Sequence, residues 1–159
     1  MTHTLILSYV TFTYFIAFVF YLFKMILQKD SWGRLASLAA WLGFLAHTLA
    51  FVLRWKASHD MGLGHAPLTN LYESLIFFAW SIAFLYLVVE WRIKSKSLGV
   101  FVVPVAFLLM AYASIAPGMN TRIEPLIPAL QSNWLTAHVL TCFMGYAAFT
   151  VAFGCALLY

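Results

Sequence analysis

Residues Leu5–Leu27 read LILSYVTFTYFIAFVFYLFKMIL, an apolar run that contains a single charged side chain, Lys24. About 20 apolar residues in an α-helix cross the hydrocarbon core of a bilayer, so this stretch is long enough to span a membrane. The run is too long for the apolar region of a signal peptide, and it has neither a basic leader nor a cleavage motif. We therefore expect it to be a retained transmembrane helix.

Four further runs share this apolar character and define the expected fold. The five expected spans are Leu5–Leu27, Leu35–Leu53, Leu68–Val89, Leu98–Ala116 and Trp134–Tyr159, with the polar links Gln28–Arg34, Arg54–Pro67, Glu90–Ser97 and Pro117–Asn133 between them. Of the 159 residues, 64% are hydrophobic and 9% are charged, which excludes an ordinary soluble domain. We predict an all-α, polytopic membrane helix bundle, a single transmembrane domain over residues 1–159, with a kink at Pro104 in the fourth span.

The lysines and arginines near the span ends predict the orientation. Six lie around the first and third links, namely Lys24, Lys29, Arg34, Arg92, Lys94 and Lys96, and three lie around the second and fourth, namely Arg54, Lys56 and Arg122. Because cytoplasmic links carry the excess of positive charge, the N-terminus and the second and fourth links are expected outside. The net charge of +4 sits at helix ends and forms no basic stripe, so the expected partner is the lipid membrane and not nucleic acid.

This topology brings two histidines to the outer face. His65 lies in the second link, and His138 lies in the fifth span, four residues (about 6 Å of helix) after Trp134. Two imidazoles in a shallow outer pocket can bind a planar or metallic ligand, for which haem iron is the leading candidate. From position alone, His65 could equally be a solvated loop residue, and Trp134 an ordinary interfacial anchor.

His47 lies inside the second span beside Thr48. It is expected either to bond a neighbouring helix or to act as a ligand or proton relay. His3 and His59 are expected to be terminal or loop residues, and we assign them no role. Two more polar groups have a clearer pattern: Asn70 and Glu73 have the spacing of a capping box, and Glu73 could also pair with one of the arginines expected outside, Arg54 or Arg122.

The fifth span carries small residues and two cysteines. Gly145, Ala147 and Ala148 are expected to permit close helix packing. Cys142 and Cys155 are 13 positions apart and point to different sides of a helix, so they cannot form a disulfide within it.

Two blocks of this sequence resemble the CcsA/ResC family of cytochrome c maturation proteins, whose members are called CcsB in some bacteria. The blocks are Gly64–Trp80, reading GHAPLTNLYESLIFFAW, and Gln131–Phe149, reading QSNWLTAHVLTCFMGYAAF. The similarity runs from about His47 to Tyr159.

The resemblance implies a role in haem delivery. Family members move haem b as a substrate to the outer face of a bacterial cytoplasmic or thylakoid-type membrane and hold it reduced. They present it to the C-x-x-C-H motif of apocytochrome c, whose thiols bond the haem vinyl groups, and they act with a second membrane component that has a large external domain. The family's first external haem-ligating histidine matches His138, which makes it the expected ligand of the haem iron.

The resemblance also has gaps. The family's tryptophan-rich W-G-x-x-W-x-W-D segment and its later histidines are not found in these 159 residues, so the chain resembles an N-terminal portion of such a protein. It is not expected to be a complete cytochrome c synthase. Two other interpretations stay open: a haem-binding or regulatory membrane protein without synthase activity, and half of a non-haem transporter with histidine proton relays.

Overall fold

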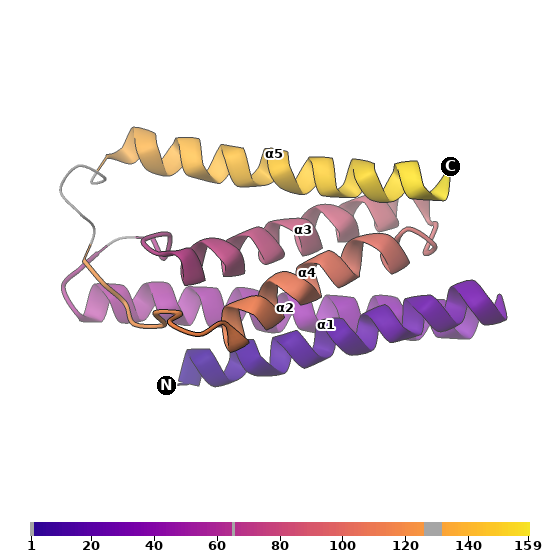
Figure 1. Cartoon of the computed structure of the whole chain (residues 1–159), viewed down its shortest axis with the longest axis horizontal. Coiled ribbons are helices and arrows are strands. Elements are labelled where there is room, and N and C mark those ends of the chain that lie inside the picture. Colours follow the sequence, from indigo (N-terminus) through magenta and orange to yellow (C-terminus); the bar gives the residue numbers. More distant parts are fainter. Residues whose placement is uncertain (1, 65, 126–131) are drawn as a thin grey trace.

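The computed structural model describes residues 2–64, 66–125 and 132–159, and these form five helices and no strand (Figure 1). The helices are α1 (Thr2–Leu27), α2 (Asp30–Asp60), α3 (Leu71–Ile93), α4 (Gly99–Ile115) and α5 (Asn133–Leu158). The predicted all-α helix bundle is confirmed. Four helices, α1, α2, α3 and α5, are long and apolar enough to span a membrane, and α4 is a shorter apolar helix. At 17 residues, α4 lies at the lower limit for a span.

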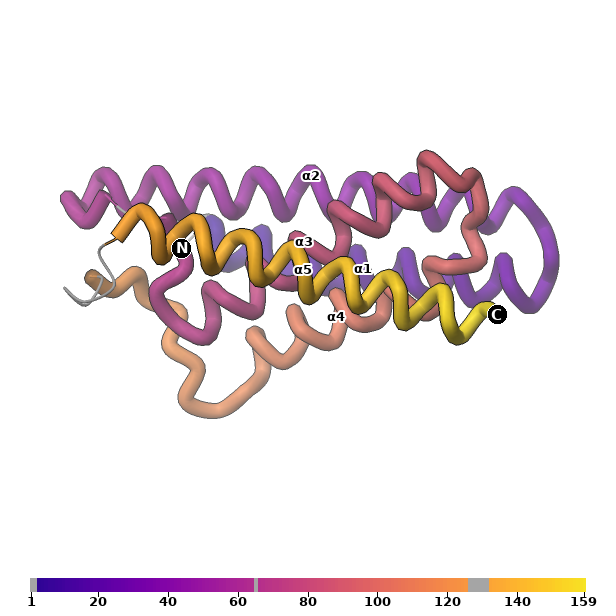
Figure 2. The backbone as a smooth tube through the Cα atoms, turned by 90° about the horizontal axis from the view of Figure 1, so that it is seen from above, coloured from indigo at the N-terminus to yellow at the C-terminus, as the bar shows by residue number. Residues whose placement is uncertain are grey.

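Helices α1–α4 supply most of the hydrophobic core, to which α5 adds Ala147 and Val151. The closest pair is α1 with α2, and α4 packs against both α1 and α3. Helix α5 lies along α3 and touches α4 more lightly (Figures 1 and 2). The first four helices therefore form a four-helix unit to which α5 is added on one side.

Small residues on α2 explain how closely it approaches α1. The buried positions of α2 recur every three or four residues and are Gly33, Ala36, Ala40, Gly43, His47, Ala50, Arg54 and Ser58. A Cβ atom at Gly43 would lie 2.9 Å from Cε1 of Tyr14 on α1, so the glycine makes room for the tyrosine ring. In a bilayer, where lipid competes with helices for apolar contacts, such small-residue stripes allow close packing.

The helices differ from the predicted spans at several ends: α1 begins at Thr2, α2 begins at Asp30 and α3 continues to Ile93. Two further differences have a clear cause. Helix α2 continues past Leu53 to Asp60, because Arg54 is buried and paired within the bundle and no helix breaker occurs before Gly62. Helix α3 begins at Leu71 and not at Leu68, because Asn70 is its N-cap.

The ends of the bundle are arranged as the predicted topology requires. The N-terminus and the α2–α3 and α4–α5 connections lie at one end, and the α1–α2 and α3–α4 connections lie at the other (Figure 1). We call these the outer end and the inner end, following the charge distribution of the sequence. The orientation itself stays a prediction, as does a kink at Pro104, which lies inside α4.

Candidate functional site

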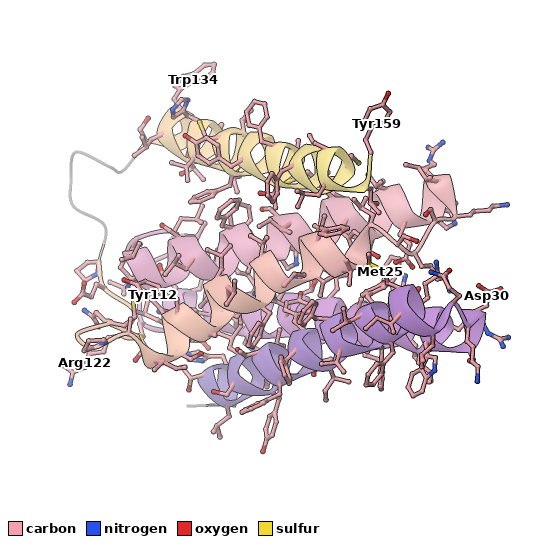
Figure 3. The ribbon with its side chains drawn as sticks, turned by 45° about the vertical axis from the view of Figure 1, so that its right-hand side comes forward. Met25, Asp30, Tyr112, Arg122, Trp134 and Tyr159 are labelled. Atoms are coloured by element: carbon pink, nitrogen blue, oxygen red, sulfur yellow. The ribbon has the colours of Figure 1, made fainter. Side chains whose placement is uncertain are left out.

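The candidate ligand His138 lies in the second turn of α5, near the outer end, and its side chain is exposed. Trp134, one turn earlier, is 86% exposed and points away from the bundle (Figure 3). Both side chains therefore lie on the surface of the described structure and do not pack in its core.

The imidazole of His138 contacts the thiol of Cys142 one turn further along α5. Its Nε2 atom lies 3.5 Å from Sγ, the length of a weak sulfur hydrogen bond. Both Cys142 and Cys155 are free, as their spacing predicted. Apart from this contact, the side chain of His138 is exposed.

His65 is outside the described residues, so its expected approach to His138 stays a prediction. Among the residues that are described, no group of three or more histidine, cysteine or acidic side chains comes together as a metal-binding cluster.

A buried ion pair holds the outer end together. Arg54 on α2 is 1% exposed, and its Nε and Nη2 atoms each lie 2.7 Å from Oε1 of Glu73 on α3. The other carboxylate oxygen of Glu73 accepts hydrogen bonds from the backbone N–H and the hydroxyl of Thr69. Asn70 accepts from the backbone N–H of Glu73 at 2.9 Å, which confirms the predicted cap of α3.

Arg54 also ties the segment after α4 to the bundle. Its guanidinium donates to the backbone carbonyl oxygens of Thr121 and Arg122, at 3.0 and 3.1 Å, and lies over the ring of Tyr72. Of the two partners considered for Glu73, the structure selects Arg54, while Arg122 supplies a carbonyl oxygen and exposes its side chain. His3, which had no assigned role, contacts Arg54 from α1 at 3.4 Å.

Beside this ion pair lies an open cavity of about 240 Å³. Its walls come from the start of α3, from the end of α4 and from the segment that follows α4, and they include Asn70, Tyr72, Tyr112, Pro117 and Met119. Arg54 thus fixes one wall of the cavity, because it holds the segment after α4 through two backbone carbonyl groups.

His47 lies in the middle of the four-helix unit and is fully buried. Its Nδ1 atom is 3.2 Å from the hydroxyl of Tyr14 on α1, so the expected bond to a neighbouring helix is present. Its Nε2 atom has no hydrogen-bond partner among the described residues. A ligand at His47 would have to enter the packed α1–α4 core, whereas His138 is open to the surroundings.

Sequence reasoning missed a buried carboxylate near the inner end. Glu90 was placed in a polar link, but it lies in the last turn of α3 and is 7% exposed. It accepts hydrogen bonds from the hydroxyls of Tyr21, Ser37 and Tyr86, which belong to α1, α2 and α3. The available signal was a carboxylate directly after the apolar residues of a span, which in a membrane helix calls for a partner.

The small residues of α5 pack only in part as expected. Ala147 is fully buried, but Ala148 is exposed and a Cβ atom at Gly145 would meet nothing within 4 Å. The packing prediction was therefore wrong for Gly145 and Ala148, because α5 touches the bundle along a single narrow stripe. Gly154 belongs to that stripe, since a Cβ atom there would lie 2.6 Å from Val102 of α4.

A family model described as cytochrome C assembly protein matches residues 68–159, which include Glu73, Trp134 and His138. The chain belongs to the cytochrome C assembly protein family. The resemblance seen in the sequence is thereby confirmed. His47, Arg54 and the tyrosines of α1 lie before the matched residues.

Individual relatives agree with this assignment. The chain is similar to the cytochrome c biogenesis protein CcsA of Pyropia yezoensis, with 43% identity over 116 residues, covering 72% of this chain and 35% of the relative. It is also similar to CcsA of Chlorella vulgaris, with 45% identity over 102 residues (64% and 31%), and to CcsA of a Picosynechococcus strain, with 45% identity over 89 residues (55% and 26%). The matched part is between about a quarter and a third of the length of these relatives. No solved structure matches the chain.

Proposed function

We propose that this protein takes part in delivering haem to the outer face of a membrane for covalent attachment to apocytochrome c. Haem b is the substrate, and His138 is an axial ligand of its iron. The observation that carries the proposal is that His138 lies within the family match and exposes its imidazole near the outer end of the bundle. A neutral imidazole in that setting is a common haem ligand.

The surroundings of His138 suit a flat, apolar macrocycle. Trp134 offers an exposed indole one turn away, and Phe143 lies on the same helix against α3. Membrane lipid can cover the rest of the porphyrin, because the outer half of α5 is largely uncovered by protein. These side chains can hold and orient haem, while the thioether bonds form between the haem vinyl groups and the cysteine thiols of apocytochrome c.

The proposal also includes partner proteins that are separate chains. A second membrane component with a large external domain would receive or stabilise the haem, and a C-x-x-C-H segment of apocytochrome c would accept it. The membrane would be a bacterial cytoplasmic membrane or a thylakoid-type membrane. Membership of a cytochrome c assembly family supports each of these roles at the level of the whole assembly.

The test replaces His138 with alanine in the complete gene. We expect the purified protein to lose most of its haem absorption and the cells to lose holocytochrome c. Added imidazole should restore part of both, because a free ring can occupy the space left by the side chain. The matched control is His59→Ala, which removes another exposed histidine, on the last turn of α2. Normal haem content and maturation in His138→Ala would overturn the proposal, as would a loss of protein that imidazole does not rescue.

A further inference from the structure

Two lysines at the inner end of the bundle lie close together and are partly buried. Lys24 belongs to the last turn of α1, and Lys96 lies in the connection between α3 and α4. Two other lysines of the same end, Lys29 and Lys94, are exposed. The partly buried pair therefore differs from the general positive charge of this end.

The side chains of this pair meet at Gly33, near the start of α2. A Cβ atom at Gly33 would lie 2.9 Å from Cδ of Lys96 and 3.2 Å from Cγ of Lys24, so both lysine stems lie against the same small surface. The ammonium group of Lys24 donates a hydrogen bond to the hydroxyl of Ser97 at 2.9 Å. The α1–α2 and α3–α4 connections thus bring two like charges together.

No carboxylate balances these two charges among the residues that the structure describes. Asp30, labelled at this end in Figure 3, is exposed, and Glu90 already accepts hydrogen bonds from three hydroxyl groups. The described ion pair belongs to Arg54 at the outer end, and Lys96 makes neither a hydrogen bond nor an ion pair with another described residue. Two partly buried ammonium groups without an acid repel each other, and an anion between them would offset that repulsion.

An aromatic surface lies next to the lysines. Phe20 is one turn before Lys24 on α1, and its ring centroid is 5.6 Å from that of Trp32, the residue before Gly33. Phe23 contacts the same indole, with the centroids 5.1 Å apart, and is 38% exposed. Aromatic side chains beside lysines are typical of the level where lipid headgroups meet acyl chains. A soluble anion would use the lysines alone, whereas a lipid would use both surfaces.

We propose that this surface, formed by Lys24, Lys96, Ser97 and the aromatic rings beside them, binds an anionic phospholipid. The lipid phosphate lies between the two ammonium groups. Ser97 accepts from Lys24 through its oxygen, and its own hydroxyl hydrogen can be donated to a phosphate oxygen. The acyl chains run along the aromatic side chains of α1 and α2. Basic pockets between transmembrane helices bind anionic headgroups in this way, and here the lipid would join two connections of the bundle.

The proposal differs from the effect of positive charge on membrane orientation. Orientation depends on the number of lysines and arginines near the inner connections, to which Lys29 and Lys94 contribute as much as the converging pair. A binding site depends on the pair alone. The site also lies at the opposite end of the bundle from His138, so its failure would leave the haem proposal untouched.

The test measures lipid retained by the purified complete protein in detergent, by native mass spectrometry. The probes are phosphatidylglycerol and phosphatidylcholine with identical acyl chains, and glycerol 3-phosphate is added as a soluble competitor. We expect phosphatidylglycerol to bind roughly tenfold or more tightly than phosphatidylcholine, because two lysines act on its net negative charge. Glycerol 3-phosphate should not displace it, since it has no acyl chains.

The variants compare equal losses of charge at one end of the bundle. Lys24→Gln combined with Lys96→Gln should weaken phosphatidylglycerol binding by roughly tenfold or more. Lys29→Gln combined with Lys94→Gln removes the same charge from exposed positions and should change binding by less than about twofold. Lys24→Arg combined with Lys96→Arg keeps both charges and should retain the lipid.

A single variant guards against loss of folding. Lys96→Gln breaks no hydrogen bond between described residues, so it should keep the circular-dichroism spectrum unchanged and still weaken binding several-fold. Its control is Lys94→Gln. Thermal unfolding gives a second measurement, because a ligand of the folded state raises the Tm. Phosphatidylglycerol should raise the Tm of the unchanged protein and of the Lys29 and Lys94 double variant more than that of the Lys24 and Lys96 double glutamine variant.

Three results would overturn the proposal. Equal weakening by the two double glutamine variants would show a general effect of charge and no site. Equal binding of phosphatidylglycerol and phosphatidylcholine would show that the lysines do not recognise the headgroup. Displacement of the lipid by glycerol 3-phosphate would identify a site for a soluble phosphate compound instead.

Discussion

Two nitrogen atoms of Arg54 converge on one oxygen of Glu73, since Nε and Nη2 both lie 2.7 Å from Oε1. Neither side chain has appreciable contact with solvent. Removing one partner of such a buried pair leaves the other charge unpaired, which costs far more than removing an exposed pair. The pair also joins α2 to α3, and through the carbonyl groups of Thr121 and Arg122 it fixes the segment after α4.

We therefore expect Arg54→Met and Glu73→Leu each to lower the free energy of unfolding by about 3–5 kcal/mol. The double variant should lose less than the sum of the two, because no unpaired charge is left behind. Chemical unfolding in detergent, followed by circular dichroism, measures all three. Arg122→Ala is the control: its side chain is exposed, and its change should stay within about 0.5 kcal/mol. Strict additivity of the two single changes would show that the residues do not act as a pair.

The packing of α5 can be tested at two glycines of the same helix. Gly154→Ala places a Cβ atom 2.6 Å from Val102 and should destabilise the protein by roughly 1–3 kcal/mol. Gly145→Ala meets nothing within 4 Å and should leave stability unchanged or raise it by up to about 1 kcal/mol, the helix-propensity difference. Thermal unfolding of both proteins gives the comparison, and equal effects at the two sites would contradict the described position of α5.

Features that depend on local sequence signals could be predicted, and features that depend on contacts between distant residues could not. Hydropathy was enough to find all five helices, and the spacing of Asn70 and Glu73 was enough to find the cap of α3, because both signals are local. The continuation of α2 past Leu53 was not predictable, since it depends on a partner for Arg54 that is 19 positions away. Glu90 was missed for the same reason, as its three hydroxyl partners come from three helices.

The orientation of the bundle is a prediction that fusion reporters can check. We expect a reporter that is active only in the cytoplasm to be active when it is joined after Lys94, at the inner end. We expect a reporter that is active only outside the cytoplasm to be active when it is joined after Met61, at the outer end. The reason is the excess of lysine and arginine around the inner connections. The opposite pattern would place His138 on the cytoplasmic side, which is incompatible with external haem presentation.

His47 and His138 should respond differently to replacement. His47→Ala should keep the haem content of the complete protein close to that of the unchanged protein, because His47 is enclosed by α1–α4. It should lower stability by about 1–3 kcal/mol, since the hydroxyl of Tyr14 loses its buried partner. Absorption spectra and thermal unfolding report the two properties separately. A haem loss as large as that of His138→Ala would place His47 among the iron ligands.

The narrow attachment of α5 determines the order in which the bundle comes apart. Among the described residues, no hydrogen bond joins α5 to α1–α4, and its buried positions are Ala147, Val151 and Gly154. Helices α1, α2 and α3, by contrast, are joined by the hydrogen bonds of Arg54, His47 and Glu90, and Arg54 also holds the segment after α4. Under rising detergent or mechanical load, α5 should separate first and carry His138 with it, while the four-helix unit and its buried network stay assembled.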